Sequence, residues 1–345
     1  MDVFGPGTEG IDEQEADRMK ALVLNEAGGP GQLKEENIDM PEPEAHELRI
    51  KVHAVGLNPV DYKLMGSPLP EWSFPHVSGL DVSGVVDAVG AEVTDWSVGD
   101  EVYYHGNMTE DGGFAEFTTT RADVVSSVPK GLTHVEAASM PTAGFTAYQS
   151  LYRKAPLRPG QTIMIQAGSG GVGSFAVQLA KHLGLTVIST CSSDNADYVK
   201  DLGADHVVDY RRENVVEEVH KWTDGRGVDV VLDLVGQQTA TEALDYLAFN
   251  GHLIAVVEWP DLSHYVAKTL APSIHEVALG FVYRSDDEAQ IKDLGFIARE
   301  LGELASQGKV KPSVSRTVSF SDIPDALKDM QDGHTRGKIV ASFEA

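Results

Sequence analysis

A glycine-rich turn between two apolar segments constrains this chain more than any other feature. Residues 162–173 read Thr-Ile-Met-Ile-Gln-Ala-Gly-Ser-Gly-Gly-Val-Gly, and a helix-patterned run over 174–183 follows directly. An apolar strand that leads through Gly168-x-Gly170-x-x-Gly173 into a helix is the dinucleotide-binding fingerprint in its usual context. Its glycines allow a tight turn, close approach of the backbone to a pyrophosphate, and close packing of helix on strand. The residues expected to hold these phosphates at the helix N-terminus are Gly168, Ser169, Gly170, Gly171, Val172 and Gly173.

Strands and helices are expected to alternate around the fingerprint. Strands are expected at 185–189, 206–208, 228–233 and 252–257, helices at 195–202, 213–222 and 238–247, and a sixth strand in the apolar run 275–283. Strands that alternate with helices of about ten residues indicate right-handed crossovers and a parallel sheet. Residues 142–280 are therefore predicted to form one doubly wound α/β domain.

The two ends of the chain have a different pattern. Short alternating runs at 48–55 and 81–89, separated by Gly and Pro, predict an antiparallel, barrel-like domain. A strand expected over 311–320 returns to it. Because 345 residues with 42% hydrophobic content can fill two cores, we expect a second domain made of 19–141 and completed by 281–345.

The composition is strongly acidic. Net charge is −26, from 53 acidic and 27 basic residues, which opposes binding to nucleic acid or to an anionic membrane. We interpret this charge as the solvated surface of a protein from a halophile, where salt screens the repulsion; the alternative is an acidic protein of a mesophile. Residues 1–18 are predicted to be an acidic disordered tail. Without an apolar run of membrane-spanning length or a signal-like N-terminus, the expected location is cytoplasmic.

The end of the second expected strand bears on the choice of cofactor. It reads Thr190-Cys191-Ser192-Ser193, without the Asp or Glu that holds the ribose of NAD. Small hydroxyl side chains leave room for a 2′-phosphate and favour NADPH. NADH stays open as the alternative, because Asp194 lies just beyond and would repel a phosphate. Asp194 is expected instead to cap the helix that begins at Asn195.

Several other segments follow one another in an order that is characteristic of one protein family. They are Met19-Lys-Ala, 56–63, 79–86, 98–102, 112–116, 141–148 and 334–340. With the fingerprint, they make the chain resemble the zinc-free quinone oxidoreductases of the medium-chain dehydrogenase/reductase superfamily over nearly all of 19–343. The resemblance implies a GroES-like antiparallel β-barrel catalytic domain plus a Rossmann domain. It also implies a homodimer, formed through the strand near 275–283.

Departures from the zinc branch of that superfamily exclude a catalytic metal. Zinc alcohol dehydrogenases carry a Cys where this chain has Asn58, Gly-His-Glu where it has Gly79-Leu80-Asp81, and another Cys near Thr142. A catalytic zinc needs three protein ligands of N, S or O type, which Asn58, Leu80 and Thr142 do not supply. A single cysteine also excludes the structural zinc loop of those enzymes. We therefore expect no metal.

The predicted reaction follows from these exclusions. No tyrosine is followed four residues later by lysine, so the Tyr-x-x-x-Lys pair of short-chain dehydrogenases is absent. Nothing obvious then polarises an alcohol, which leaves hydride transfer from NADPH to a small molecule that is already electrophilic, a quinone or an α,β-unsaturated carbonyl. The alternatives are an enoyl-thioester reductase on the same fold and a non-catalytic nucleotide-sensing protein.

The resemblance also implies roles for residues outside the fingerprint. Those expected to contact the cofactor are Asn58, Thr142 and Thr146 around the nicotinamide end, Val256, and Ser192, Ser193, Tyr210 and Lys338 (with Arg336 as an alternative to Lys338) near the adenosine ribose phosphate. Candidate donors to the substrate are Tyr62 and Lys63, with a core aromatic and a surface cation as the alternative readings. Asp61 is expected to be a turn or helix cap, and Cys191 a packed small hydrophobe.

Overall fold

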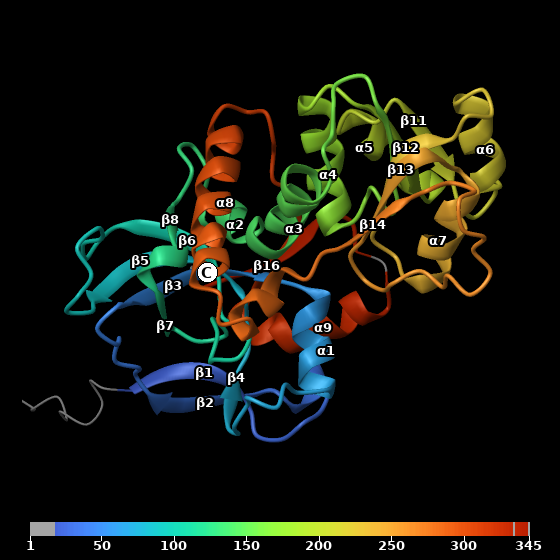
Figure 1. Cartoon of the computed structure of the whole chain (residues 1–345). Helices are drawn as coiled ribbons and strands as arrows, with labels where there is room; N and C mark the ends of the chain where they lie inside the picture. The colour runs from blue at the N-terminus through green and yellow to red at the C-terminus, as the bar shows by residue number, and fades with distance from the viewer. Residues whose placement is uncertain (1–17, 334, 344–345) are drawn as a thin grey trace, which may run out of the picture.

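The computed structural model describes residues 18–333 and 335–343. One large, mostly antiparallel sheet and one parallel sheet lie at opposite ends of the molecule (Figure 1). The predicted acidic tail falls outside the described residues except for its last member, Arg18. That residue already begins the first strand, β1, instead of ending the tail.

The parallel sheet has six strands in the order β11-β10-β9-β12-β13-β14, and every neighbouring pair is parallel. Its strands are β9 (Thr162–Ile165), β10 (Thr186–Cys191), β11 (His206–Asp209), β12 (Val228–Asp233), β13 (Leu247–Ala255) and β14 (Ser273–Glu276). Its helices are α4 (Gly171–His182), α5 (Ala196–Asp201), α6 (Val215–Trp222) and α7 (Gln237–Glu242). The predicted doubly wound Rossmann sheet is confirmed. Its strand order reverses between β9 and β12, the position where such sheets bind ligands.

Three local predictions in this domain are wrong. The sixth strand ends at Glu276, and Leu279–Arg284 forms a 3-10 helix, because Gly280 packs against the other domain: a Cβ there would lie 3.1 Å from Met108 Sδ. The helix expected over 238–247 ends at Glu242 because Leu247 already begins β13. Asp194 caps no helix, since it lies inside a 3-10 turn and α5 begins at Ala196.

The second domain is built around a seven-stranded sheet. Six strands follow the order β15-β16-β3-β5-β6-β8 and β7 also pairs with β3, while β2-β1-β4 make a separate sheet. The strands are β1 (Arg18–Leu24), β2 (Lys34–Asp39), β3 (Glu47–Leu57), β4 (His76–Val77), β5 (Asp81–Val89), β6 (Glu101–His105), β7 (Phe117–Arg121), β8 (Ser126–Ser127), β15 (Val314–Ser319) and β16 (Lys338–Ser342). The alternating runs at 48–55 and 81–89 lie in β3 and β5, and the expected returning strand is β15. The predicted GroES-like barrel is confirmed.

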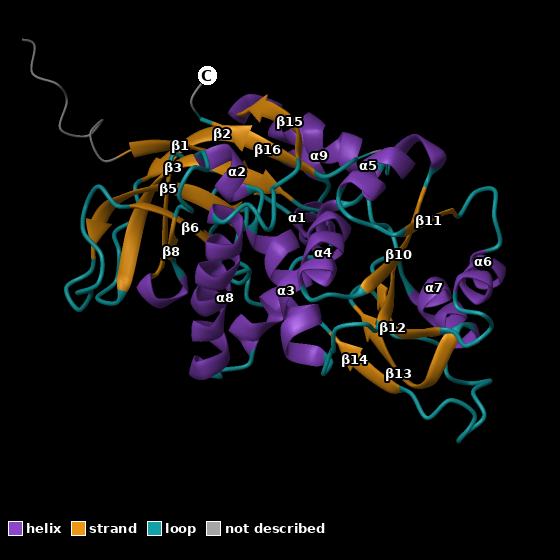
Figure 2. Cartoon of the chain, turned by 90° about the horizontal axis from the view of Figure 1, so that it is seen from above, coloured by secondary structure: helices purple, strands orange, loops and turns teal. Residues whose placement is uncertain are grey.

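Some of the helices lie between the two large sheets. The α-helices not yet named are α1 (Pro59–Gly66), α2 (His134–Ala138), α3 (Thr146–Gln149), α8 (Glu288–Ser306) and α9 (Ile323–Gln331). Figure 2 shows α3, α4 and α8 packed between the sheets, and a Cβ at Gly144 would lie 2.5 Å from Leu301 of α8. No helix among the described residues is long and apolar enough to cross a membrane. The homodimer through the edge strand β14 stays a prediction.

Candidate functional site

The fingerprint turn joins β9 to α4 beside the point where the strand order reverses. The N-cap of α4 is Gly170, whose lack of a side chain leaves the N–H groups of the first turn available to an anion. A Cβ added at Gly170 would meet no atom closer than 3.4 Å, whereas one at Gly173 would lie 2.2 Å from the Ala167 carbonyl oxygen. The middle glycine therefore leaves open space above the helix, and the last glycine allows the helix to pack on the turn, as the motif requires.

Strand register brings three polar residues from distant parts of the chain together. β3 runs antiparallel to β16 and to β5, and its last residues pair with the beginnings of these two strands: Leu57 with Ile339, and Gly56 with Asp81. Asn58, which follows β3, consequently lies beside Asp81 and Lys338. The Lys338 ammonium is 3.1 Å from the Asp81 carboxylate, and both side chains are almost completely buried.

Every polar atom of this ion pair has partners. Lys338 Nζ also donates to the Leu57 carbonyl at 3.1 Å and to Asn58 Oδ1. Asn58 Nδ2 donates to Asp81 Oδ2 at 2.9 Å, and Asp81 Oδ1 accepts the N–H of Thr142 at 2.8 Å and its hydroxyl at 2.5 Å. We call Asn58, Asp81, Thr142 and Lys338 the buried network. All three ammonium protons have partners, in the Leu57 carbonyl, Asn58 and Asp81. These bonds disfavour the predicted role of Lys338 at the adenosine ribose phosphate.

Asp61 borders the buried network and caps α1, as predicted. Its Oδ2 accepts the Asn58 N–H at 2.8 Å, while Oδ1 is buried and has no hydrogen-bond partner among the described residues. Burial, together with the nearby charge of Asp81, raises the pKa of Asp61 to about 8. Asp61 is therefore a neutral carboxylic acid at pH 7.

The substitution Asp61→Asn is expected to remove a pH dependence of stability. The folded protein keeps a proton on Asp61 up to about pH 8, whereas the unfolded chain loses it near pH 3.8. The unfolding free energy should thus fall as pH rises between these values, by at most ~1.4 kcal/mol per pH unit. Asn keeps the acceptor for the Asn58 N–H and carries no charge. Urea unfolding at several pH values between these limits should show a steeper loss in the parent than in the variant; parallel profiles would contradict the raised pKa.

The residues predicted to bind the adenosine end of the cofactor lie at the ends of β10 and β11 and close to them. Ser192 is half-buried there, and Ser193 and Tyr210 are exposed. The exposed Arg336 reaches this edge, since its guanidinium lies 5.1 Å from the ring centroid of Tyr198 in α5. No ion pair engages Arg336 within the described part of the chain. It is consequently the better placed of the two predicted cations for a ribose phosphate.

The remaining predicted residues are divided between core and surface. Tyr62 is half-buried in α1 and packs against the main core, and burial raises its pKa. Lys63, next to it, is exposed. Thr146 is buried at the start of α3. Cys191 is buried and burial raises its pKa to about 11, which fits the predicted packed residue better than a reactive thiol.

Two carboxylates of the site were missed at the level of sequence. Asp81 was noted only as a replacement within the zinc pattern. Asp233 ends β12 beside the strand-order reversal: its Oδ1 accepts the N–H groups of Val235 and Gly236, and its buried Oδ2 has no partner among the described residues. The predicted Val256 lies next to it, donating its N–H to the Asp233 carbonyl at 3.1 Å. Asp233 could have been found from the sequence, because it is a carboxylate at the end of an expected central strand.

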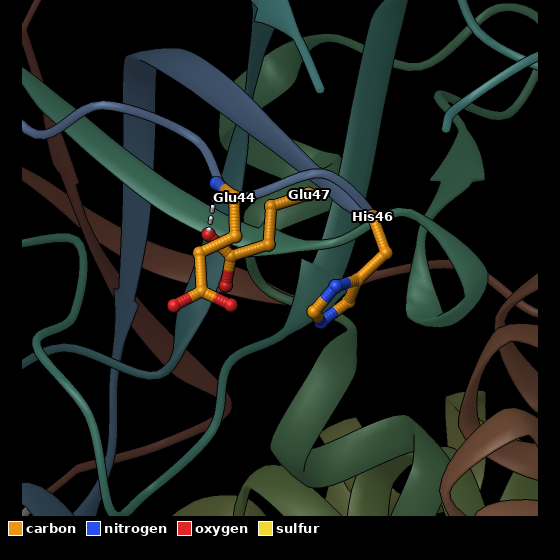
Figure 3. A group of neighbouring side chains, drawn as sticks. All are labelled: Glu44, His46 and Glu47. Atoms are coloured by element: carbon orange, nitrogen blue, oxygen red, sulfur yellow. Dashed lines mark hydrogen bonds between the residues drawn. The ribbon is translucent and has the colours of Figure 1, made fainter. Parts of the chain in front are cut away.

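The residues around Asn58 do not fit a catalytic zinc. Leu80 and Thr142 are poor ligands, the Asn58 amide is bonded within the buried network, and a lysine cation lies against Asp81. In residues 18–333 and 335–343, one trio of ligand-type side chains lies close enough to share an ion: Glu44, His46 and Glu47, whose ligand atoms are within 4.8 Å of one another (Figure 3). The trio lines a cavity of about 610 Å³ whose lining includes no predicted site residue.

Comparisons with known proteins agree with this architecture. The family model described as "Alcohol dehydrogenase GroES-like domain" matches residues 44–130, and "Zinc-binding dehydrogenase" matches 202–340. The zebrafish (Danio rerio) mitochondrial NAD(P)H oxidoreductase RTN4IP1 is 33% identical over 86% of this chain and 84% of its own length. The Arabidopsis thaliana chloroplastic NADPH-dependent alkenal/one oxidoreductase is 33% identical over 93% of this chain and 79% of its own.

A solved structure extends the likeness to the whole fold. The quinone oxidoreductase from Coxiella burnetii superimposes with a TM-score of 0.81 and 30% identity, over 95% of this chain and 100% of that chain. Its match spans both domains, as do the matches to the two relatives. The chain belongs to the medium-chain dehydrogenase/reductase superfamily of oxidoreductases.

Proposed function

We propose that this protein transfers a hydride from NADPH to a quinone or an α,β-unsaturated carbonyl without a metal. The observation that carries the proposal is the open fingerprint turn in a chain whose buried network places a lysine cation where a zinc site would need ligands. Relatives named for quinone and for alkenal/one reduction support both acceptor classes. Such acceptors are electrophilic already, so a bound Lewis acid is not required.

The residues present fit a dinucleotide. The open space at Gly170 suits a pyrophosphate. NADPH is favoured over NADH because Ser192 and Ser193 stand where an NAD site carries a carboxylate, and because the cation of Arg336, which has no ion pair among the described residues, lies over Tyr198 nearby. When bound, the reduced nicotinamide supplies the hydride.

The chain's own residues would then stabilise the charge that develops on the acceptor. As the hydride adds to the ring or to the enone β-carbon, the acceptor oxygen becomes negative and gains from a nearby donor. Tyr62 is the candidate donor. Its raised pKa keeps the hydroxyl protonated, so it donates a hydrogen bond, and water then supplies the proton that completes the hydroquinone or the saturated carbonyl.

The acidic surface sets the conditions for the assay. With a net charge of −26, we propose that concentrated salt supports the folded state by screening self-repulsion. Activity should therefore be measured in molar potassium chloride, with dilute buffer as the comparison. Higher activity in dilute buffer would contradict the proposed salt adaptation and leave the proposed reaction intact.

The proposed reaction is tested by following reduced-cofactor absorbance with quinones, enones, enoyl thioesters and alcohols. We expect quinone or enone turnover with kcat/KM at least about tenfold higher for NADPH than for NADH, a preference of ~1.4 kcal/mol, unchanged by a chelator. The variant Tyr62→Phe, which removes only the hydroxyl, should lower kcat more than it changes KM. Turnover confined to enoyl thioesters, chelator-sensitive alcohol oxidation, or tight nucleotide binding without turnover would each contradict the proposal.

A further inference from the structure

We infer that Lys338 and Asp81 are positioning residues that place the nicotinamide half of the cofactor, while the adenosine half binds independently of them. The inference rests on the proposed function and assigns a role to an ion pair whose polar atoms are all bonded to other groups of the protein. It follows from the contacts of the two side chains. They bond to Asn58 and Thr142, and the Lys338 side chain also packs against the fingerprint turn.

The pair controls the geometry of Asn58 and Thr142 directly. Asn58 Oδ1 accepts from Lys338 and Asn58 Nδ2 donates to Asp81, so both ends of the amide are fixed by the pair. Asp81 Oδ1 receives both polar groups of Thr142. Thr142 lies in a π-helical turn, Pro141–Phe145, an irregular backbone geometry that is frequent at functional sites. Removing the charges would loosen both side chains and leave the Asn58 amide its bond to the Gly56 carbonyl at 3.2 Å.

The same pair is in contact with the fingerprint turn through Lys338. A Cβ at Gly171 would lie 3.2 Å from Lys338 Cδ and 3.5 Å from Ala143 Cβ. The N–H of Gly337 donates to the Ser169 carbonyl at 2.9 Å. The start of β16 therefore lies against two fingerprint residues while its lysine head reaches the buried network. The Lys338 side chain thus fixes the position of Asn58 and Thr142 relative to the fingerprint turn.

The burial of the pair argues against a role in stability alone, because removing two charges from water costs free energy. Lys338 and Asp81 are 4% and 0% exposed at their side chains, and desolvation of two such charges commonly cancels their attraction. Well-packed apolar residues of similar size often serve stability equally well. What apolar residues do not supply is directional bonds to an amide and a hydroxyl from separate segments. Position, more than stability, is what this ion pair determines.

The test compares two ligands on the double variant Asp81→Asn/Lys338→Met, which leaves no unpaired buried charge. The first ligand, 2′,5′-ADP, carries only the adenosine half, and the second is NADPH. By calorimetry we expect the Kd of 2′,5′-ADP to stay within about twofold and that of NADPH to rise about tenfold. With a quinone acceptor, kcat should fall about thirtyfold or more. Equal weakening of both ligands, or no change in either, would overturn the inference.

Two further variants separate positioning from folding. Arg49→Met breaks the ion pair with Asp87, which joins the same two strands, β3 and β5, with atoms 2.7 Å apart. It should lower the melting temperature without changing the ratio of the two Kd values; a ratio shifted as in the double variant would contradict the inference. Thr142→Val removes one hydroxyl from the network at nearly constant volume and should weaken NADPH alone, by about threefold. An unchanged NADPH Kd would count against the inference. Because binding needs no acceptor, these results remain decisive if the parent reduces none.

Discussion

Replacing Gly170 by alanine is expected to abolish tight NADPH binding and to leave the fold intact. The backbone at Gly170, φ −78° and ψ 179°, is accessible to alanine, and the new Cβ would meet no atom closer than 3.4 Å. The methyl group would instead occupy the open space that a pyrophosphate needs in order to reach the N–H groups of α4.

We expect the Kd for NADPH to rise at least about 100-fold, or ~2.7 kcal/mol, with a melting temperature close to that of the parent. Isothermal titration calorimetry and scanning calorimetry measure the two quantities. Unchanged affinity in Gly170→Ala would show that the phosphates lie elsewhere on the molecule. A strongly lowered melting temperature would show that Gly170 is required for packing.

Replacing Gly173 by alanine is expected to destabilise the fold itself. The added Cβ would lie 2.2 Å from the Ala167 carbonyl oxygen and 2.7 Å from Gly168 Cα, and these are backbone atoms that no rotamer change can move. Relief requires shifting α4 away from β9, which should cost about 2–4 kcal/mol of unfolding free energy.

Urea unfolding measures this loss. Gly29→Ala is the matched control: Gly29 has φ −82°, and a Cβ there meets nothing within 4 Å. The control should therefore lie within about 0.5 kcal/mol of the parent. A Gly173→Ala variant as stable as the control would contradict the packing role of the last fingerprint glycine.

The parallel domain could be predicted from the sequence because its signals are local. The apolar run 228–233 coincides with β12, and the strand–glycine–helix order at 162–183 gave the turn and α4. One error, in the sixth strand, occurs where a contact between domains decides the structure. The run 275–283 is apolar enough for a strand, yet the chain turns after Glu276 because Gly280 packs against His105 and Met108.

In the candidate site, too, the residues that are close together in the sequence could be predicted and those that meet only through the fold could not. The fingerprint residues are contiguous and were identified from spacing alone. The buried network was not, because Lys338 and Asp81 are 257 positions apart in the chain and meet only through the pairing of β16, β3 and β5. A lysine near a nucleotide site suggests a phosphate partner, and only the register of three strands shows that its partner is a buried carboxylate.

The central claim is that hydride passes from the nicotinamide of NADPH to an electrophilic acceptor on this protein. The most direct test uses NADPH deuterated at C4, on each face in turn, with an enone acceptor and protein treated with a chelator. Deuterium from one of the two labelled cofactors should appear at the β-carbon of the saturated product. Tight binding of NADPH, with no deuterium at that carbon from either label and no oxidation of NADPH by a quinone, would contradict the claim.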